Sequence, residues 1–117
     1  MCPAGWHLPD TTEWNALKKF VADSLFKGNT DSVSFALKST SGWDNDGNGF
    51  DPFGFSMLPS GRRYYVDGGS FNGLLNTAFF WGPLEYSATY AYFFDGGGCA
   101  IFKHDKNVAR SVRCVKD

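Results

Sequence analysis

Five oxygen-bearing side chains lie close together in one short glycine-rich stretch. In the run D-N-D-G-N-G-F-D at residues 44–51, Asp44, Asp46 and Asn48 take the first, third and fifth positions, and a glycine takes the sixth. This is how an EF-hand calcium loop begins, but at position twelve Phe55 replaces the bidentate glutamate. Two interpretations are open: a calcium site formed by Asp44, Asp46, Asn48 and Asp51, or a turn whose side chains bond their own backbone.

Side chains able to carry out catalysis are few. His7 and His104 are the only imidazoles, Glu13 and Glu85 are the only glutamates, and neither G-x-S-x-G nor H-E-x-x-H occurs. A glycosidase needs two carboxylates, and Glu13 is better explained as a helix-capping residue. We expect a structural His7, an exposed His104 and a protein that is not an enzyme.

Three cysteines are present. Cys2 and Cys114 lie at opposite ends of the chain, which suits a bridge between the termini, and Cys99 is then unpaired. The alternative is a set of reduced thiols in a cytosolic protein. There is no C-x-x-C spacing, so the sequence does not support zinc or thioredoxin-like chemistry.

Composition limits the function classes. The 117 residues suffice for one domain, which we place at residues 1–117. Eleven basic residues against twelve acidic ones give a net charge of −1, which argues against nucleic-acid partners and against a polybasic membrane anchor. No apolar run is long enough for direct membrane insertion, and no signal segment is recognisable in this chain.

The first quarter of the chain predicts one main helix. Asp10 followed by Glu13 forms a capping-box pattern, and we expect a helix from about residue 11 to residue 26 that Gly28 terminates. A short second helix is plausible around residues 32–37. The apolar side chains recur at helical spacing: Trp14, Leu17, Val21 and Leu25.

The rest of the chain predicts a long loop and then strands. Residues 39–63 carry five glycines and two prolines among several aromatic residues, which indicates a long loop packed by its own rings. The order of elements predicts an α+β domain with a C-terminal antiparallel sheet. Short β-like runs follow at residues 64–66, 77–81, 90–94, 100–103 and 111–115, with a hairpin tip at 95–98.

One stretch is unusually aromatic. Residues 79–102 hold nine of the 21 aromatic residues, and strand alternation separates positions 90, 92 and 94 from 91 and 93. A domain this small cannot bury both faces of such a strand fully, so we predict an aromatic binding face within residues 81–106. The alternative is that all these side chains are core. The predicted ligand-binding residues are Trp81, Gly82, Leu84, Tyr86, Tyr90, Tyr92, Phe94, Asp95, Phe102 and His104.

Several motifs, in order along the chain, resemble the Fibrobacter succinogenes major paralogous domain family. They are C-P-A-G-W-H-L-P (2–9), E-W (13–14), L-K-S-T-S-G-W (37–43), G-F-S-M-L-P-S-G-R (54–62), G-S-F (69–71) and S-V-R-C-V (111–115). The L-P-x-x-x-E-W element also resembles the formylglycine-generating-enzyme branch of C-type-lectin-like folds.

The resemblance implies a C-type-lectin-like fold whose termini are joined by Cys2 and Cys114. It brings no established catalytic residues, and the family occurs mainly in secreted or surface proteins of Bacteroidetes and Fibrobacteres. We therefore expect a non-catalytic ligand-recognition module, secreted or at the cell surface, that binds a surface protein or a carbohydrate. No cofactor is implied, and calcium is the one candidate ion. The alternative is a glycan-active or formylglycine-type enzyme relative.

One departure from the family lies inside the aromatic stretch. After Trp81 the family typically reads S-S-T-E-Y, whereas this chain has G-P-L-E-Y, and an odd Cys99 follows. C-type-lectin-like domains are the usual display scaffold of diversity-generating retroelements. A variable protein diversified over residues 82–110 is one explanation, and ordinary divergence is the other.

Overall fold

A computed structural model describes residues 1–65, 68–84, 88–94, 98–104 and 107–117, with side chains described for 1–65, 68–83, 98–102 and 107–117. Within these residues the chain is an α+β domain, as predicted. None of the described helices is both long and apolar enough to span a membrane. The elements in chain order are β1 (Trp6–His7), α1 (Thr11–Leu25), α2 (Val33–Leu37), β2 (Ser60–Tyr64), β3 (Phe71–Leu74), β4 (Thr77–Leu84), β5 (Ala88–Phe94), β6 (Cys99–His104), β7 (Val108–Ala109) and β8 (Val115–Lys116).

The predicted capping box sets the start of α1. The Glu13 N–H donates to Asp10 Oδ1 at 2.8 Å, and the Asp10 N–H donates to Glu13 Oε2 at 2.9 Å. These bonds satisfy two backbone donors, one within the first turn of the helix and one at its cap. The helix ends at Leu25, where Gly28, at a φ of 85°, donates its N–H to the Ala22 carbonyl at 3.0 Å. Both ends agree with the sequence prediction to within one residue.

The main sheet is mixed, which corrects the expectation of a purely antiparallel one. Its order is β3-β2-β4-β5-β6, with β7 paired to β2. The β2–β4 pair is parallel, with Gly61 opposite Ala78, whereas β4–β5 and β5–β6 are antiparallel. Strand β3 was missed because its F-N-G-L sequence lacks β-branched residues. In place of a strand at 111–115 the chain forms β7, β8 and a single bridge from Ser111 to Phe80.

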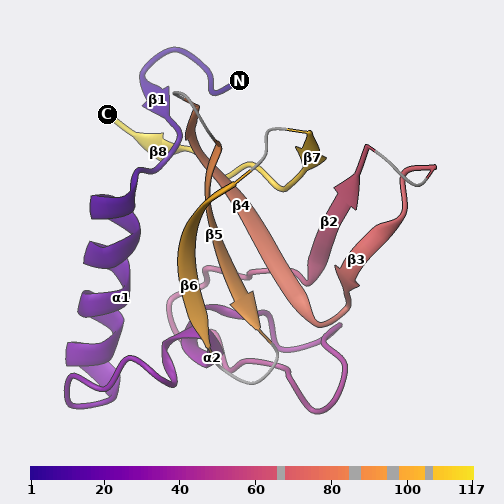
Figure 1. Ribbon diagram of the computed structural model, residues 1–117. Helices are drawn as coiled ribbons and strands as arrows, with labels where there is room; N and C mark the ends of the chain where they lie inside the picture. The colour runs from indigo at the N-terminus through magenta and orange to yellow at the C-terminus, as the bar shows by residue number, and fades with distance from the viewer. Residues whose placement is uncertain (66–67, 85–87, 95–97, 105–106) are drawn as a thin grey trace.

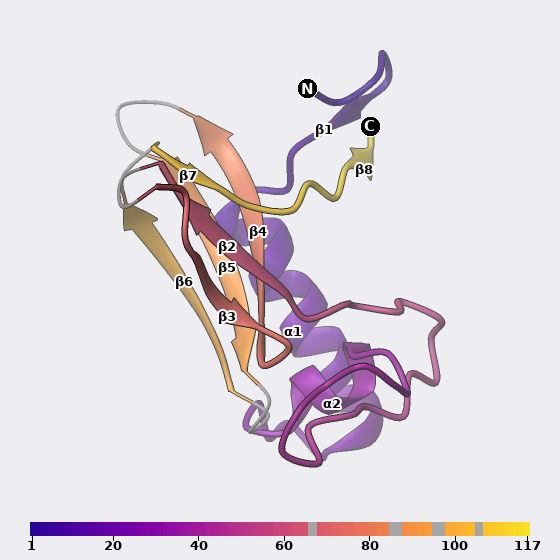
Figure 2. The same cartoon turned by 90° about the vertical axis from the view of Figure 1, so that its right-hand side faces the viewer.

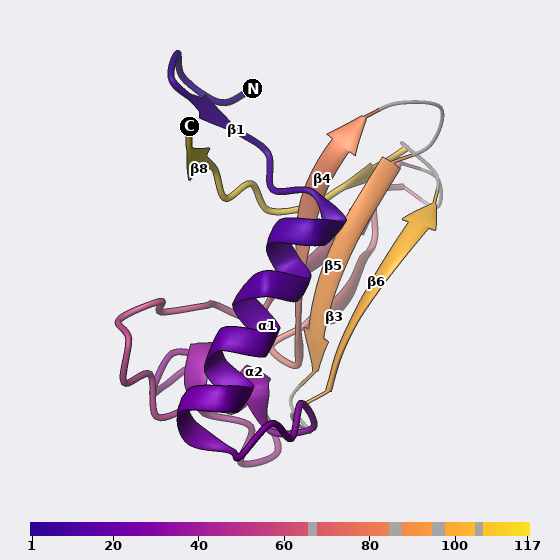
Figure 3. The same ribbon diagram turned by 90° about the vertical axis from the view of Figure 1, so that its left-hand side faces the viewer.

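The core lies between the helices and one face of the sheet, and α1 runs across that face (Figure 3). The long central segment supplies Trp43, whose Nε1–H donates to Ser39 Oγ at 3.1 Å and to the Met57 carbonyl at 3.2 Å. Phe50 and Phe53 stay about half exposed, so the loop's own rings pack it only in part. The buried cluster consists of Trp14, Val21, Ala22, Val33, Ala36, Leu37, Trp43, Met57, Ala78 and Phe80.

The two termini lie side by side at one end of the domain (Figures 1 and 2). Strands β1 and β8 pair antiparallel, and a disulfide joins Cys2 to Cys114 across 112 residues of sequence. This confirms the pairing that the family resemblance implied. His7 adds a polar clasp, since its Nε2 lies 2.7 Å from Glu13 Oε1 and its Nδ1 lies 2.6 Å from Asp117 Oδ1.

The His7 clasp predicts a pH-dependent stability. Hydrogen bonds to Asp117 and then to Glu13 raise the pKa of His7 above its ordinary 6.5. The folded state therefore holds this proton more tightly than the unfolded state does. The contribution is fully present below pH 6.5 and is lost as the pH rises through the folded-state pKa. Unfolding by denaturant across this range should show the loss. This loss of stability with rising pH should be absent from a His7→Gln variant. A variant whose stability depends on pH as the wild type's does would contradict the role of the His7 clasp.

Candidate ligand-binding face

The strand register separates a core face from an outer face. Ala78, Phe80, Cys99 and Ile101 pack toward the core, so the alternate positions belong to the opposite side of the sheet. We call that side the outer face. Its described residues are Arg62, Tyr64, Phe79, Trp81, Phe102 and Arg110.

Arginines cover the central part of the outer face. The Arg110 guanidinium lies 4.5 Å from the Trp81 ring centroid, and Arg62 lies 4.7 Å from Phe79 and 4.9 Å from Tyr64. These distances are within the range of cation–π attraction. Trp81 is only 8% exposed beneath this layer.

The burial of Trp81 corrects part of the predicted site. Ser111 exchanges backbone hydrogen bonds with β4 at Phe79 and Trp81, at 2.9 and 3.0 Å, and so places residue 111 beside the strand and the Arg110 guanidinium over the Trp81 ring. Gly82 is buried as well. The sequence predicts Trp81 and Gly82 on an exposed binding face. They are part of the packed framework instead, because the returning chain removes them from solvent.

Of the remaining residues predicted for the binding face, the structure describes the side chain of Phe102, the backbone of several others and nothing of two. Phe102 is 48% exposed, as a contact residue should be. In the backbone register Tyr90 lies between Trp81 and Phe102, and Tyr92 between Phe79 and Ala100. That any of these residues contacts a ligand stays a prediction. Tyr86 and Asp95 lie outside the described residues, as do the side chains of Leu84, Tyr90, Tyr92, Phe94 and His104.

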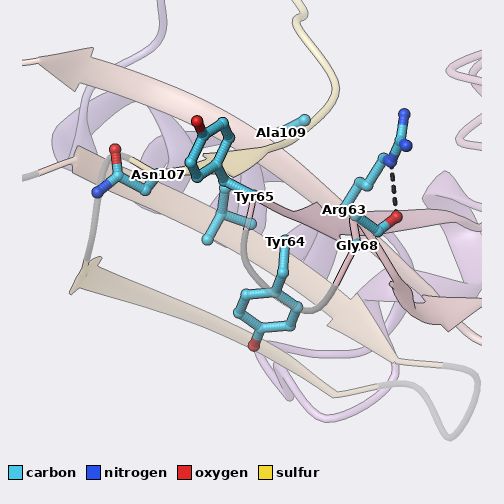
Figure 4. A pocket seen from close by; sticks show the side chains of 8 residues that line it. Arg63, Tyr64, Tyr65, Gly68, Asn107 and Ala109 are labelled. Atoms are coloured by element: carbon cyan, nitrogen blue, oxygen red, sulfur yellow. Dashed lines mark hydrogen bonds between the residues drawn. The ribbon is translucent and has the colours of Figure 1, made fainter.

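A hollow that the sequence did not predict lies between the end of β2, residues 68–69 and β7 (Figure 4). We call it the β2–β7 hollow, and its volume is about 640 Å³. Tyr65 stands at its rim with 85% of its surface exposed. The sequence assigned residues 64–66 to an ordinary strand, although the run R-R-Y-Y before D-G-G was an available signal. The lining residues are Arg63, Tyr64, Tyr65, Gly68, Gly69, Asn107, Val108 and Ala109.

Arg63 is held in place at this hollow. Its Nε–H donates to the Gly69 carbonyl at 2.6 Å, and its guanidinium lies 5.7 Å from the Phe71 ring centroid. Gly69 has a φ of 79°, which favours glycine, and a Cβ added there would lie 2.6 Å from an Arg63 terminal nitrogen, so the guanidinium would have to shift to admit a larger residue. Arg63 is thus a fixed cation at the surface.

In the acidic loop at residues 44–51, some side-chain oxygens already accept hydrogen bonds from neighbouring residues of the chain. Asn48 Oδ1 accepts the Trp43 N–H at 2.9 Å, and Asp51 accepts the Ser56 N–H at 3.1 Å and its hydroxyl at 2.7 Å. Partial burial acts to raise the pKa of Asp51, but the Ser56 hydrogen bonds outweigh it and lower the value. Across the described side chains no three His, Cys, Asp or Glu residues form a metal-binding group. Calcium binding by Asp44, Asp46, Asn48 and Asp51 stays a prediction, which melting with calcium and with chelator tests.

Cys99 is half-buried and packs against the core, so its thiol lies on the side of the sheet opposite the outer face. Burial raises the pKa of its thiol to about 11, although the charge of Lys18 acts in the opposite direction.

This burial predicts an unreactive thiol. Because the thiolate is the nucleophile, we expect Cys99 to be alkylated by iodoacetamide at pH 8 about 100-fold more slowly than an exposed cysteine. Mass spectrometry of the unreduced protein would measure the rate, and the same protein unfolded in denaturant is the control. Equal rates in the folded and unfolded protein would contradict the assignment.

Comparison with protein families gives one match. A family model described as Fibrobacter succinogenes major domain (Fib_succ_major) matches residues 1–116. No curated protein and no solved structure matches the chain.

Proposed function

Because the chain belongs to the Fibrobacter succinogenes major domain family, we propose that it is a non-catalytic recognition module with a C-type-lectin-like fold. Three features support that fold: the paired and disulfide-joined termini, the helix packed on one face of a mixed sheet, and the long segment between α2 and β2. The disulfide is compatible with a secreted or cell-surface location.

The observation that carries the proposal is the exposed aromatic surface beside the β2–β7 hollow. Tyr65 and Phe71 are 85% and 59% exposed on the side of β2 that carries Arg63, and Phe102, 48% exposed on the outer face of edge strand β6, is a second and separate exposed ring. Aromatic side chains supply rigid contact area, and a tyrosine adds a polar group at its tip. We propose that these residues, with the predicted positions 84–104, contact a surface protein or a carbohydrate.

Binding measurements with matched variants test this function. On glycan and surface-protein arrays the wild-type domain should bind a ligand. The substitutions Tyr65→Ala and Phe102→Ala should each weaken that binding about tenfold or more, as contacts at an interface hot spot do. Phe20→Ala is the control, because Phe20 is also exposed but lies on α1. Binding that neither Tyr65→Ala nor Phe102→Ala affects would refute the proposed face.

Measurement of turnover distinguishes the enzymatic alternative from the recognition module. Substitution of Glu85 and His104 would abolish turnover in a glycan-active relative, but would only weaken ligand binding in a recognition module. Detectable turnover lost in those variants would overturn the non-catalytic assignment.

Diversification of residues 82–110 by a retroelement is a proposal about the same face. It rests on the departure from the family after Trp81, and the core packing of Cys99 gives it no support. The genomic neighbourhood decides it: a nearby reverse transcriptase and a near-copy of these codons are expected. Absence of both would favour ordinary divergence.

A further inference from the structure

Arg63 keeps most of its hydrogen-bonding capacity. A guanidinium carries five N–H donors, and the Gly69 carbonyl accepts from Nε, which leaves the two terminal nitrogens for a ligand. Among the ion pairs found between described residues, none involves Arg63. The stack on Phe71 and the bond to Gly69 orient the guanidinium plane, so less conformational entropy is lost when a ligand binds.

Tyr65 offers a flat surface on the same side of the chain. Arg63 and Tyr65 are two residues apart, and Figure 4 shows their side chains on one side of the strand and Tyr64 on the other. The Cα atoms of residues two apart in extended backbone are about 7 Å apart, so an oligosaccharide can contact both groups. The hollow beside them, at about 640 Å³, is within the usual size range of small-molecule sites.

The chemistry of these two groups specifies a ligand class. The electron-rich face of a tyrosine ring attracts the C–H groups on the face of a sugar ring. An oriented guanidinium favours a carboxylate, which accepts two parallel hydrogen bonds from it.

From this arrangement we propose that the β2–β7 hollow binds acidic carbohydrate, with Tyr65 stacked on a sugar ring and Arg63 holding the carboxylate of a uronic acid. The inference rests on the proposed recognition function and names its ligand. It assigns the contact to residues 63–65, 68–71 and 107–109, outside the predicted stretch 81–106.

Calorimetric titration with defined oligosaccharides tests the inference. The probes are oligogalacturonate, oligoglucuronate and alginate oligomers, each compared with its methyl ester, which keeps the sugar rings but removes the charge. We expect at least one acid to bind about tenfold or more tightly than its ester, and the difference to shrink as salt is added.

Four variants assign the contacts. Arg63→Gln should reduce affinity for the acid about tenfold and leave the ester unaffected, and Arg63→Lys should fall between, since lysine keeps the charge but loses the bidentate geometry. Tyr65→Ala should weaken both acid and ester. Lys27→Gln removes an exposed charge on another part of the surface and should change nothing. Arg63 and Tyr65 are exposed, so equal melting temperatures are expected for these variants and serve as the folding check.

The outcomes separate the inference from the proposed function. If no uronate binds, or if acid and ester bind equally, the acidic-carbohydrate inference is overturned. The recognition function survives that result if Tyr65→Ala still abolishes binding to a protein or a neutral glycan. If Tyr65→Ala and Phe102→Ala affect no ligand at all, both proposals fail.

Discussion

Replacing Gly49 by alanine is expected to lower the free energy of unfolding by about 3 kcal/mol or more. A Cβ at this position would overlap the carbonyl oxygens of Lys38 and Phe35 and lie 2.6 Å from Lys38 Cβ. Those atoms cannot easily move away. The N–H groups of Gly49 and Phe50 donate to the Ser39 and Phe35 carbonyls, both at 2.9 Å, and hold the loop against the end of α2.

Denaturant unfolding measures this loss, and Gly54 supplies the control in the same loop. Gly54 has a φ of 66° and open space around its Cβ direction, so Gly54→Ala adds backbone strain without a steric clash. That strain costs about 1–2 kcal/mol. A loss at Gly49 no larger than the loss at Gly54 would show that the loop can move away from α2.

Removing the Cys2–Cys114 disulfide is expected to cost about 2–5 kcal/mol. The bridge spans 112 residues, so it restricts nearly the whole unfolded chain. In the folded state the strands that it reinforces are only two residues each. The pairing of the termini therefore depends on the disulfide and on the His7 clasp.

Unfolding of a Cys2→Ser, Cys114→Ser double variant would measure this contribution. Cys99→Ser is the matched control, because it removes the free thiol and keeps the bridge. Reductant should destabilise the wild type and the Cys99→Ser protein equally, and should leave the double variant unchanged. A double variant as stable as the wild type would contradict the expected role of the bridge.

The parts of the fold that depend on neighbouring residues were predictable. Asp10 and Glu13 form a capping box through contacts three residues apart, and Gly28 terminates the helix through its own backbone. The α+β class follows from the order of these local patterns. The Cys2–Cys114 pair was found through the family resemblance, because spacing alone leaves the pairing of three cysteines open.

The candidate site was only partly predictable. Aromatic content marked residues 79–102, but content does not say which rings the returning chain covers. Phe102 is exposed on an edge strand, whereas Trp81 lies under Arg110 because Ser111 pairs alongside β4. The β2–β7 hollow could not be predicted because it joins residues 63–65 and 68–69 to residues 107–109, some forty residues apart in sequence.

The sequence by itself determined the family, the main helix and its caps, the α+β class and the near-neutral charge that argues against nucleic-acid partners. These properties depend on composition and on the spacing of nearby residues, and both are the same whether or not the chain is folded. Only the tertiary structure decided which aromatic and basic side chains reach solvent. That outcome depends on the parallel pairing of β2 with β4 and on the return of β7 to β2, which bury Trp81 and leave Tyr65 and Arg63 exposed together.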